Sequence, residues 1–369
     1  MPSLYIGLMS GTSLDGVDAV LADLQAGLRV LAHVNQPFSS AMRDELLALN
    51  HSGPNELHRA MLAGNALARA YAQAVATLLA EAGLGASDIT ALGAHGQTVR
   101  HRPGEFDGCG YTVQLLNAAL LAELSGIDVV ADLRSRDVAA GGQGAPLVPA
   151  FHAALFGQPG MTQAVLNLGG IANLTLLGAD GQLGGFDCGP ANALMDGWCA
   201  QHLGQAFDAG GAWAASGQVD AALLAAMLAE PFFHRAPPKS TGRDLFHADW
   251  LAAQLGDRPL KPADVQATLA ELTARSAAAA LQQHGSAPAQ RLLVCGGGAL
   301  NGHLMDRLAA LLPGVPVLST AEAGLPPLQV EAAAFAWLAQ AFVNRQAGNR
   351  PEVTGAAGPR VLGALHPAR

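Results

Sequence analysis

The segment at residues 11–18 combines the residue types with which a protein turn binds phosphate. Its members are Gly11, Thr12, Ser13, Leu14, Asp15, Gly16, Val17 and Asp18. Turn amides and the Thr and Ser hydroxyls can donate to phosphate oxygens, and Asp15 or Asp18 can hold a hydrated Mg²⁺ through carboxylate oxygen. No GxxxxGK[ST] pattern occurs, so this is not a Walker A loop. The alternative is an ordinary hairpin turn with Asp-Gly at its tip.

Two further glycine-rich segments lie in the second half of the chain. Asn167–Asn173 contains Gly169 and Gly170, and Cys295–Asn301 contains Gly296, Gly297 and Asn301. Paired glycines let a phosphate come close to the backbone, although they also occur in any tight turn. The second segment lies between an expected strand and an expected helix, where an adenosine can lie against glycine backbone. It does not fit GxGxxG, which disfavours a dinucleotide-binding fold.

Three polar residues at the ends of expected strands could face a ligand. Asp187 stands in a glycine-flanked segment and could serve as a general base, or it could cap the following helix. His95 and Arg134 each follow a strand, and each could equally be a structural residue. Cys188 has no His partner nearby in the sequence, so we interpret it as structural.

Apolar periodicity predicts strands interleaved with helices in both halves of the chain. Strands are expected at 4–9, 17–24, 89–94, 127–131, 164–168, 171–177, 184–187 and 291–295, and helices at 56–82, 117–125, 191–203, 219–228, 262–283, 302–311 and 329–346. Each half begins with a glycine-rich hairpin, at Gly7–Asp18 and at Asn167–Asn173. The sequence therefore predicts two related α/β lobes with a ligand cleft, and the Ala- and Gly-rich residues 139–144 suit a crossing between them.

Composition limits the classes of partner. A chain of 369 residues that is 50% hydrophobic and 13% charged has enough apolar side chains for about two domains. A net charge of −9 and the lack of Lys/Arg runs argue against nucleic acid and anionic membranes as partners. The four cysteines are scattered, which favours free thiols in a reducing cytoplasm. The N-terminus lacks a basic, apolar leader pattern, so a cytoplasmic protein is expected.

A series of motifs runs through the chain in a characteristic order. They read SGTSLDGVD, AHGQT, GGQGAPLVP, LNLGGIANLT, GFDCGPANALMD, PPKSTGR, CGGGALNGHLM and EAAAFAWLA. Together they resemble the anhydro-N-acetylmuramic acid kinase family, within the sugar kinase/actin/chaperone ATPase superfamily. The resemblance extends from about Tyr5 to Gly363, which is nearly the whole chain.

This resemblance implies a two-lobed, actin-like ATPase fold (ribonuclease H-like), with its active site in the cleft between the lobes. Lobe I would comprise residues 1–137 and about 338–369, and lobe II residues 138–337. Residues 11–18 and the Gly169-Gly170 turn would contact the phosphates of ATP, and residues 295–301 would border the adenosine. Asp187 matches the family's catalytic base. The positions expected near the sugar or its carboxylate are His95, Gln97, Arg134 and Glu331.

The resemblance also implies the reaction. The family uses ATP and Mg²⁺ to open the 1,6-anhydro ring of 1,6-anhydro-N-acetylmuramate and to phosphorylate O6, in peptidoglycan recycling. It usually forms homodimers. A levoglucosan kinase shares the fold and chemistry and is the nearest alternative. A chaperone-like or actin-like ATPase with a conformational output is a second alternative from another class.

The chain departs from the family pattern at a few positions. Cys188 replaces the usual Thr, Ala191 replaces a Gly, and Leu328 stands where an acidic residue is common. The run Val113–Asn117 also differs from the usual Gln-Ile-Gly motif. These departures leave the exact sugar contacts open, whereas the base and the first phosphate segment are retained.

Overall fold

The computed structural model describes residues 3–11, 13–242, 245–285 and 287–368, and the chain divides into two compact units. Unit 1 contains Met1–Leu155 and Gln329–Arg369, and unit 2 contains Phe156–Leu328. Unit 1 is therefore discontinuous in sequence, with unit 2 inserted into it. The functional lobe limits expected from the sequence, at 137/138 and about 337/338, stay a prediction.

The sheet of unit 1 has the strand order β13-β7-β4-β1-β2-β3. Its strands are β1 (Leu4–Met9), β2 (Gly16–Asp23), β3 (Arg29–Pro37), β4 (Ala91–Ala94), β7 (Val129–Ala131) and β13 (Ala364–His366). The hairpin neighbours β1, β2 and β3 pair antiparallel, whereas β4 and β7 continue the sheet parallel to β1. A separate hairpin is formed by β5 (Gln97–Pro103) and β6 (Gly110–Leu115).

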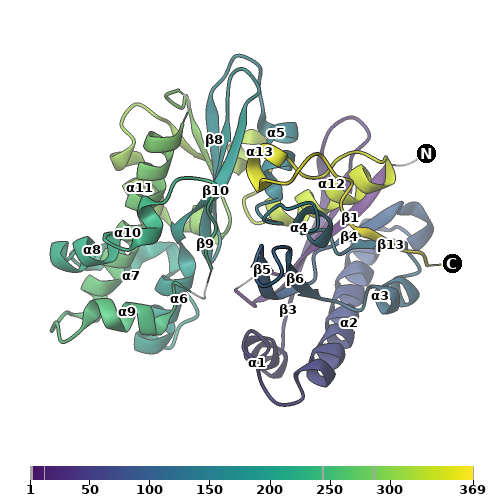
Figure 1. Ribbon diagram of the computed structural model, residues 1–369, viewed down its shortest axis with the longest axis horizontal. Helices are drawn as coiled ribbons and strands as arrows, with labels where there is room; N and C mark the ends of the chain where they lie inside the picture. Colours follow the sequence, from purple (N-terminus) through teal and green to yellow (C-terminus); the bar gives the residue numbers. More distant parts are fainter. Residues whose placement is uncertain (1–2, 12, 243–244, 286, 369) are drawn as a thin grey trace. The chain divides into compact units, whose positions relative to one another are not determined.

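Helices α2 (Glu56–Ala82) and α3 (Ala118–Ser125) pack on one face of this sheet, and α12 (Val330–Val343) packs on the other (Figure 1). The other helices of unit 1 are α1 (Ser40–Ala48), α4 (Ser135–Val138), α5 (Val148–Phe156) and α13 (Pro351–Thr354). Ile6 and Leu8 of β1 join the core formed with α2. Gly7 points to the other face, because side chains alternate along a strand, and there α12 passes very close. A Cβ on Gly7 would overlap the carbonyl oxygen of Ala332, and one on Gly93 that of Phe335.

The sheet of unit 2 repeats the topology, in the order β10-β9-β8-β11-β12. Its strands are β8 (Gln163–Leu168), β9 (Ile171–Leu177), β10 (Leu183–Pro190), β11 (Leu292–Cys295) and β12 (Val317–Ser319). The first three pair antiparallel, and β11 and β12 follow parallel to β8. In both units, the first strand thus pairs with its antiparallel hairpin partner on one side and with a parallel strand on the other. The expectation of two related α/β lobes, each opened by a hairpin, is confirmed at the level of strand order.

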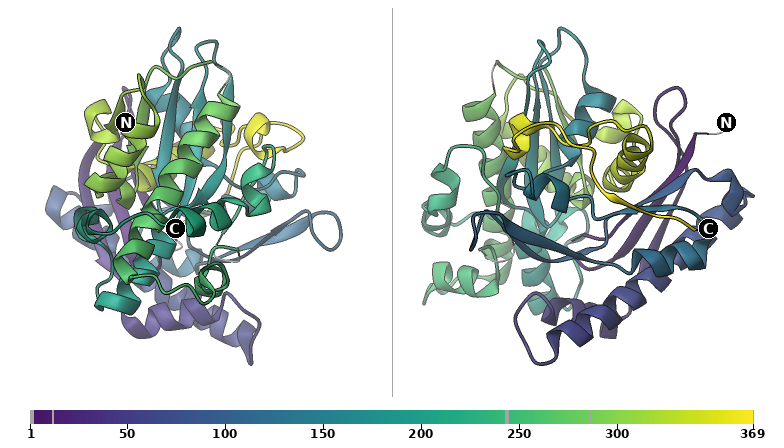
Figure 2. Two further views of the ribbon diagram at one scale, coloured as in Figure 1. Left: turned by 90° about the vertical axis from the view of Figure 1, so that its left-hand side faces the viewer. Right: turned by 45° about the vertical axis from the view of Figure 1, so that its right-hand side comes forward.

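The helices of unit 2 lie beside its sheet (Figure 2). Their buried apolar side chains form one core with that sheet. The helices are α6 (Asn192–Leu203), α7 (Ala212–Ser216), α8 (Ala221–Leu228), α9 (Ala248–Leu255), α10 (Pro262–His284) and α11 (Gly302–Leu311). The 3₁₀ turns of the two units are Ala86–Asp88, Ala209–Gly211, Pro231–His234, Gly297–Leu300 and Thr320–Ala323. The long helix α10 is buried along most of its length, which makes it the centre of this core. Within the described residues, the helices are all too short or too polar to cross a bilayer.

Candidate functional site

The β1–β2 connection is a tight turn at the end of β1. The amide of Leu14 donates to the carbonyl of Gly11 at 3.2 Å, and Leu14 has a positive φ of 61°. Asp15 is exposed, whereas the Oδ1 atom of Asp18 lies 3.2 Å from His33 Nε2 and accepts from Asn35 Nδ2 at 3.0 Å. Thr12, an expected phosphate contact, lies outside the described residues. Asp15 therefore has the more available carboxylate of the two expected magnesium ligands.

No group of three or more His, Cys, Asp or Glu side chains is arranged around a metal position within the described ranges. Magnesium bound with a nucleotide does not need such a group of protein ligands, because one or two carboxylates, waters and phosphate oxygens complete its coordination. An exposed aspartate beside a turn of donor groups fits that ligand type.

The carboxyl ends of three parallel strands bring the expected sugar residues of unit 1 together. Ser10 follows β1, His95 follows β4, and Arg134 comes shortly after β7. His95 Nδ1 lies 3.2 Å from the carbonyl oxygen of Ser10, and its Nε2 lies 3.1 and 3.0 Å from Nε and Nη2 of Arg134. Arginine can only donate, so Nε2 is the acceptor and Nδ1 carries the proton. The imidazole is a neutral link between the β1 turn and the Arg134 guanidinium.

Burial and the positive charge of Arg134 lower the pKa of His95 to about 3. Burial also lowers the pKa of His152 to about 3. In the unfolded chain both groups titrate near about 6.5. Between these values the unfolded state binds protons that the folded state does not, so both histidines lower stability as the pH falls from 6.5 towards 3.

We therefore expect the free energy of unfolding to decrease on acidification by about 1.4 kcal/mol per pH unit for each of these histidines. Urea denaturation of the wild type and of a His95→Gln variant between pH 7 and 4 measures this. The variant should have the shallower slope, since glutamine does not titrate. An NMR signal of His95 that titrates near pH 6.5 would contradict the assignment.

Gln97 and Glu331 lie near this cluster in different ways. Gln97 is buried, and its Nε2 donates to the carbonyl of Gly11 at 3.1 Å, while its Oε1 has no hydrogen-bond partner among the described residues. Glu331 lies in the first turn of α12, one turn before Phe335, whose ring centroid is 4.9 Å from that of His95. The structure thus brings His95, Gln97 and Arg134 together at the β1 turn and places Glu331 on the neighbouring helix.

A buried carboxylate that the motifs did not single out supports Arg134. Asp137 is fully buried, and its Oδ2 accepts a hydrogen bond from the amide of Gly144 at 2.7 Å. Its Oδ1 accepts hydrogen bonds from Asn349 Nδ2 at 2.7 Å and from Thr354 Oγ1 at 2.8 Å. The carbonyl of Gly144 in turn accepts from Arg134 Nη1 at 2.7 Å. Asp137 therefore fixes the loop that orients the guanidinium.

In unit 2, the Gly169-Gly170 turn is fastened to the start of α6. The carbonyl of Gly169 accepts from the amide of Asn192 at 3.0 Å, and that of Gly170 accepts from the amides of Ala191 and Ala193 at 3.1 and 3.2 Å. Asn192 Nδ2 also donates to the carbonyl of Leu168 at 2.9 Å. These bonds direct the turn carbonyls into the protein, which gives the turn a fixed shape.

The segment after β11 crosses close to the end of β8. Gly296 has a φ of 77°, and a Cβ there would lie 2.5 Å from Asn167 Oδ1 and 2.7 Å from the carbonyl oxygen of Leu168. Only glycine combines this conformation with this approach. Asn301 is the N-cap of α11, where its Oδ1 accepts from the amide of Leu304 at 3.0 Å. Two glycine turns thus meet at the carboxyl ends of β8 and β11, the usual ligand side of an α/β sheet.

Asp187 lies at a bulge in the edge strand β10. Its Oδ2 accepts from the backbone amide of Thr241 at 2.9 Å, and its own amide donates to the carbonyl of Lys239 at 3.1 Å. The alternative that Asp187 caps the next helix is wrong, since Ala191 is the N-cap of α6. The carboxylate is partly exposed and held in one orientation, as a general base requires.

Cys188 and Lys239 flank this carboxylate. Cys188 is buried, burial followed by the Asp187 charge raises the pKa of its thiol, and its Sγ lies 3.5 Å from the carbonyl oxygen of Ala172. A thiol of this kind is a poor nucleophile, which agrees with a structural role. Burial also lowers the pKa of Lys239, whose Nζ lies 4.9 Å from the ring centroid of Phe232. All four cysteines are free, as expected.

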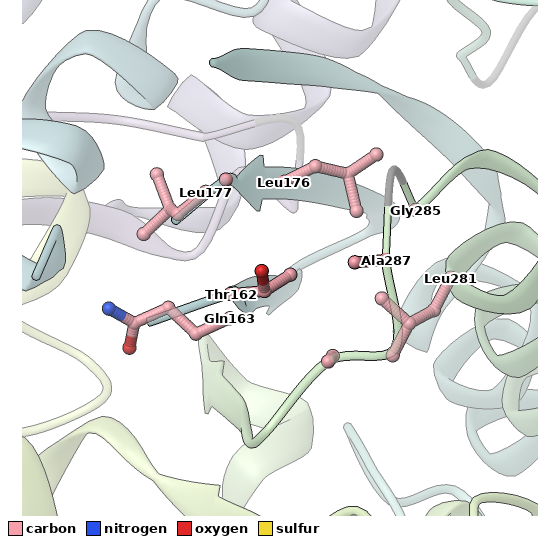
Figure 3. A pocket seen from close by; sticks show the side chains of 9 residues that line it. Thr162, Gln163, Leu176, Leu177, Leu281, Gly285 and Ala287 are labelled. Atoms are coloured by element: carbon pink, nitrogen blue, oxygen red, sulfur yellow. The ribbon is translucent and has the colours of Figure 1, made fainter. Parts of the chain in front are cut away.

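A small hollow in unit 2 lies at the opposite end of the strands from these turns. It is lined by the start of β8, the end of β9 and residues near the end of α10, including Thr162, Leu176 and Leu281 (Figure 3). Its volume of about 10 Å³ accommodates roughly one water molecule. This hollow is too small and too distant along the strands to serve the site.

Comparisons with known proteins agree with these features. The family model described as anhydro-N-acetylmuramic acid kinase matches residues 3–368. The anhydro-N-acetylmuramic acid kinase of Variovorax paradoxus is 63% identical over 99% of both chains, and that of Albidiferax ferrireducens is 60% identical over 100% of both.

A solved structure is similar in fold. Component A of the (R)-2-hydroxyglutaryl-CoA dehydratase of Acidaminococcus fermentans has a TM-score of 0.50 at 12% identity, covering 90% of this chain and 96% of that one. With the repeated strand order, this likeness confirms the expected α/β, actin-like ATPase fold class. The full-length match and the high identities settle the family. The chain belongs to the anhydro-N-acetylmuramic acid kinase family.

Proposed function

We propose that the protein uses ATP to open the 1,6-anhydro ring of 1,6-anhydro-N-acetylmuramate and to phosphorylate O6. The products are N-acetylmuramate 6-phosphate and ADP, in the recycling of cell wall peptidoglycan. Relatives named for this activity share 57–63% of their residues with the chain over nearly its whole length. The structural observation that carries the proposal is the Asp187 carboxylate, held at 2.9 Å by the Thr241 amide at the end of β10.

Asp187 is the proposed general base. O6 of the substrate carries no proton, because the bridge ties it to C1, so the base acts on water. As water attacks C1, its proton passes to Asp187 and a bond forms between the water oxygen and C1. The C1–O6 bond breaks, O6 bonds to the γ-phosphorus, and the bond from the γ-phosphorus to the ADP oxygen breaks. The proton on Asp187 then leaves to solvent, which balances the reaction.

The glycine turns are proposed to hold the nucleotide. Residues 11–18 and the Gly169-Gly170 turn contact the phosphates through backbone amides and hydroxyls. Gly296, Gly297 and Asn301 border the adenosine. Supporting this assignment, the turn after β11 lies beside the end of β8, and Asn301 at the end of that turn caps α11. Phosphoryl transfer depends mainly on such positioning and on electrostatic stabilisation.

Magnesium is part of the proposal, with Asp15 and Asp18 as the residues that would hold it through water or directly. The ion supplies charge neutralisation on the transferring phosphoryl group. Asp15 is the better candidate, because Asp18 already accepts a hydrogen bond from Asn35.

His95, Gln97, Arg134 and Glu331 are proposed to bind the sugar. A guanidinium suits the lactyl carboxylate, which distinguishes the muramate from levoglucosan. The neutral His95 supports Arg134 without competing for the anion, since its Nε2 accepts from the guanidinium.

We infer that the protein is a cytoplasmic homodimer that binds no nucleic acid, with lobe I at 1–137 and about 338–369 and lobe II at 138–337. The net charge of −9 supports the exclusion of polyanions, and the four free cysteines suit a reducing compartment.

The test is ADP release with 1,6-anhydro-N-acetylmuramate, levoglucosan, N-acetylmuramate or no sugar, in ¹⁸O-labelled water. We expect fast turnover with the anhydro-muramate and ¹⁸O at C1 of the product by mass spectrometry. A preference for levoglucosan would keep the chemistry and reject the substrate. Sugar-independent ADP release would instead indicate an ATPase with a conformational output.

A further inference from the structure

The segment Lys239–Thr241 runs along the free edge of β10 and belongs to the PPKSTGR motif. Two hydrogen bonds join it to Asp187: the Asp187 amide donates to the Lys239 carbonyl at 3.1 Å, and the Thr241 amide donates to Asp187 Oδ2 at 2.9 Å. Lys239 fastens the segment, because its Nζ donates to the carbonyls of Phe232 and Phe233 at 3.4 and 3.2 Å. The segment is thus fixed on both sides of Ser240.

The side chain of Thr241 carries a hydroxyl close in sequence to the amide that binds the proposed base. Its Oγ1 is shielded from solvent and has no hydrogen-bond partner among the described residues, although the residue as a whole is partly exposed. A buried hydroxyl without a partner destabilises a protein, so such groups are rare unless they serve a ligand. Because the residue is partly exposed, a change between staggered rotamers can bring the hydroxyl to a ligand.

The hydrogen bond between the Thr241 amide and Asp187 limits the distance from the Thr241 hydroxyl to the carboxylate. Three covalent bonds separate the Thr241 amide nitrogen from Oγ1, so Oγ1 lies within about 7 Å of Asp187 Oδ2. One water with two hydrogen bonds of about 2.8 Å each bridges groups up to about 5.6 Å apart, which lies inside this limit.

We propose that the Thr241 hydroxyl accepts one hydrogen of the attacking water while Asp187 accepts the other. Two acceptors fix the orientation of the water and direct an oxygen lone pair at C1. Thr241 exchanges no proton in this step, so the balance of the reaction is unchanged and Asp187 remains the base. This inference rests on the proposed function and adds a residue that binds the nucleophile.

Two substitutions separate the hydroxyl from the rest of the residue. Thr241→Val keeps the shape and the amide that holds Asp187, whereas Thr241→Ser keeps the hydroxyl. We expect Thr241→Val to lower kcat by about 10–100-fold with little change in KM for the sugar, and Thr241→Ser to stay within about threefold of the wild type. We also expect the midpoint of thermal unfolding of Thr241→Val to be equal to or above that of the wild type, since the variant lacks a buried hydroxyl that has no partner among the described residues.

The combination of lower kcat with undiminished stability is the result that a purely structural role cannot give. Wild-type kcat in Thr241→Val, or a loss of activity that follows a loss of stability, overturns the proposal. A higher KM with unchanged kcat also overturns it, because the hydroxyl would then bind sugar and not water. Failure of the proposed function is seen separately, as a wild type that does not place ¹⁸O at C1 of the anhydro-muramate.

Discussion

Asp187→Asn is expected to lower kcat by about 10²–10⁴-fold, the usual contribution of a general base. Asparagine has nearly the same shape, and its carbonyl oxygen can still accept from the Thr241 amide, which lies 2.9 Å from Asp187 Oδ2. The Lys239–Thr241 segment should therefore stay in place, and the loss should fall on proton removal from water. Steady-state ADP release with 1,6-anhydro-N-acetylmuramate measures it, together with KM for ATP, which should change little.

Asp257→Asn is the matched control, because it makes the same change in charge at an exposed aspartate of the same unit. Asp257 lies after α9. It should keep wild-type kcat. Near-native turnover in Asp187→Asn would remove Asp187 from the role of base and require another acceptor of the water proton.

Gly93→Ala is expected to destabilise the protein by about 3 kcal/mol or more, the upper range for overpacking a core. The added methyl would overlap the carbonyl oxygen of Phe335, which belongs to the backbone of α12 and cannot rotate away. The helix must move off the sheet, and it carries Phe335, which contacts His95. Urea denaturation or the thermal midpoint measures the effect, and activity should fall with stability.

Gly197→Ala provides the control for the glycine-to-alanine change itself. Gly197 lies inside α6, is exposed, and has nothing within 4 Å of an added Cβ. Alanine there should raise the free energy of unfolding by about 0.5–1 kcal/mol through helix propensity. Equal effects at the two glycines would mean that α12 does not pack on β4 as closely as the structure has it.

The elements best predicted from the sequence were those with strong local patterns. Helix α2 at Glu56–Ala82 and helix α11 at Gly302–Leu311 have the expected limits. An apolar stripe marks both helices, Gly83 ends α2, and Asn301 caps the start of α11. The hairpin of β8 and β9 was likewise correct, since two glycines separate two apolar runs. These features depend on interactions between residues close in sequence, so the local sequence is enough to predict them.

The elements that were missed have weak patterns of their own. Strand β3, Arg29–Pro37, is a largely exposed edge strand, so it lacks the apolar run that marks a buried strand. The β5–β6 hairpin contains Arg100, His101 and Arg102, and a chain read alone gives no reason to pair them. Strand order as a whole depends on contacts between distant segments, so the sequence indicates only that the two halves are similar.

The candidate site also combines features with a local sequence pattern and features that depend on distant contacts. Glycine turns at strand ends were visible as motifs, but the grouping of His95, Gln97 and Arg134 came from resemblance to a family. Asp137 could not be found, since its partners Asn349 and Thr354 lie more than 200 positions away in the sequence. Thr241 stood in a visible motif, yet its importance depends on a hydrogen bond to a strand 54 positions earlier.

The insertion of unit 2 into unit 1 has a consequence for biosynthesis. A chain leaves the ribosome from its N-terminus, so β1, β4 and β7 emerge long before α12 and β13, which lie after residue 329. Unit 2 is continuous and can fold as soon as it has emerged. Until translation ends, however, the face of the first sheet around Gly7 and Gly93 lacks its covering helix, and β7 lacks its edge partner. A truncated product that stops before α12 would expose both surfaces. Synthesis of the last forty or so residues therefore covers the surfaces through which the nascent enzyme could aggregate.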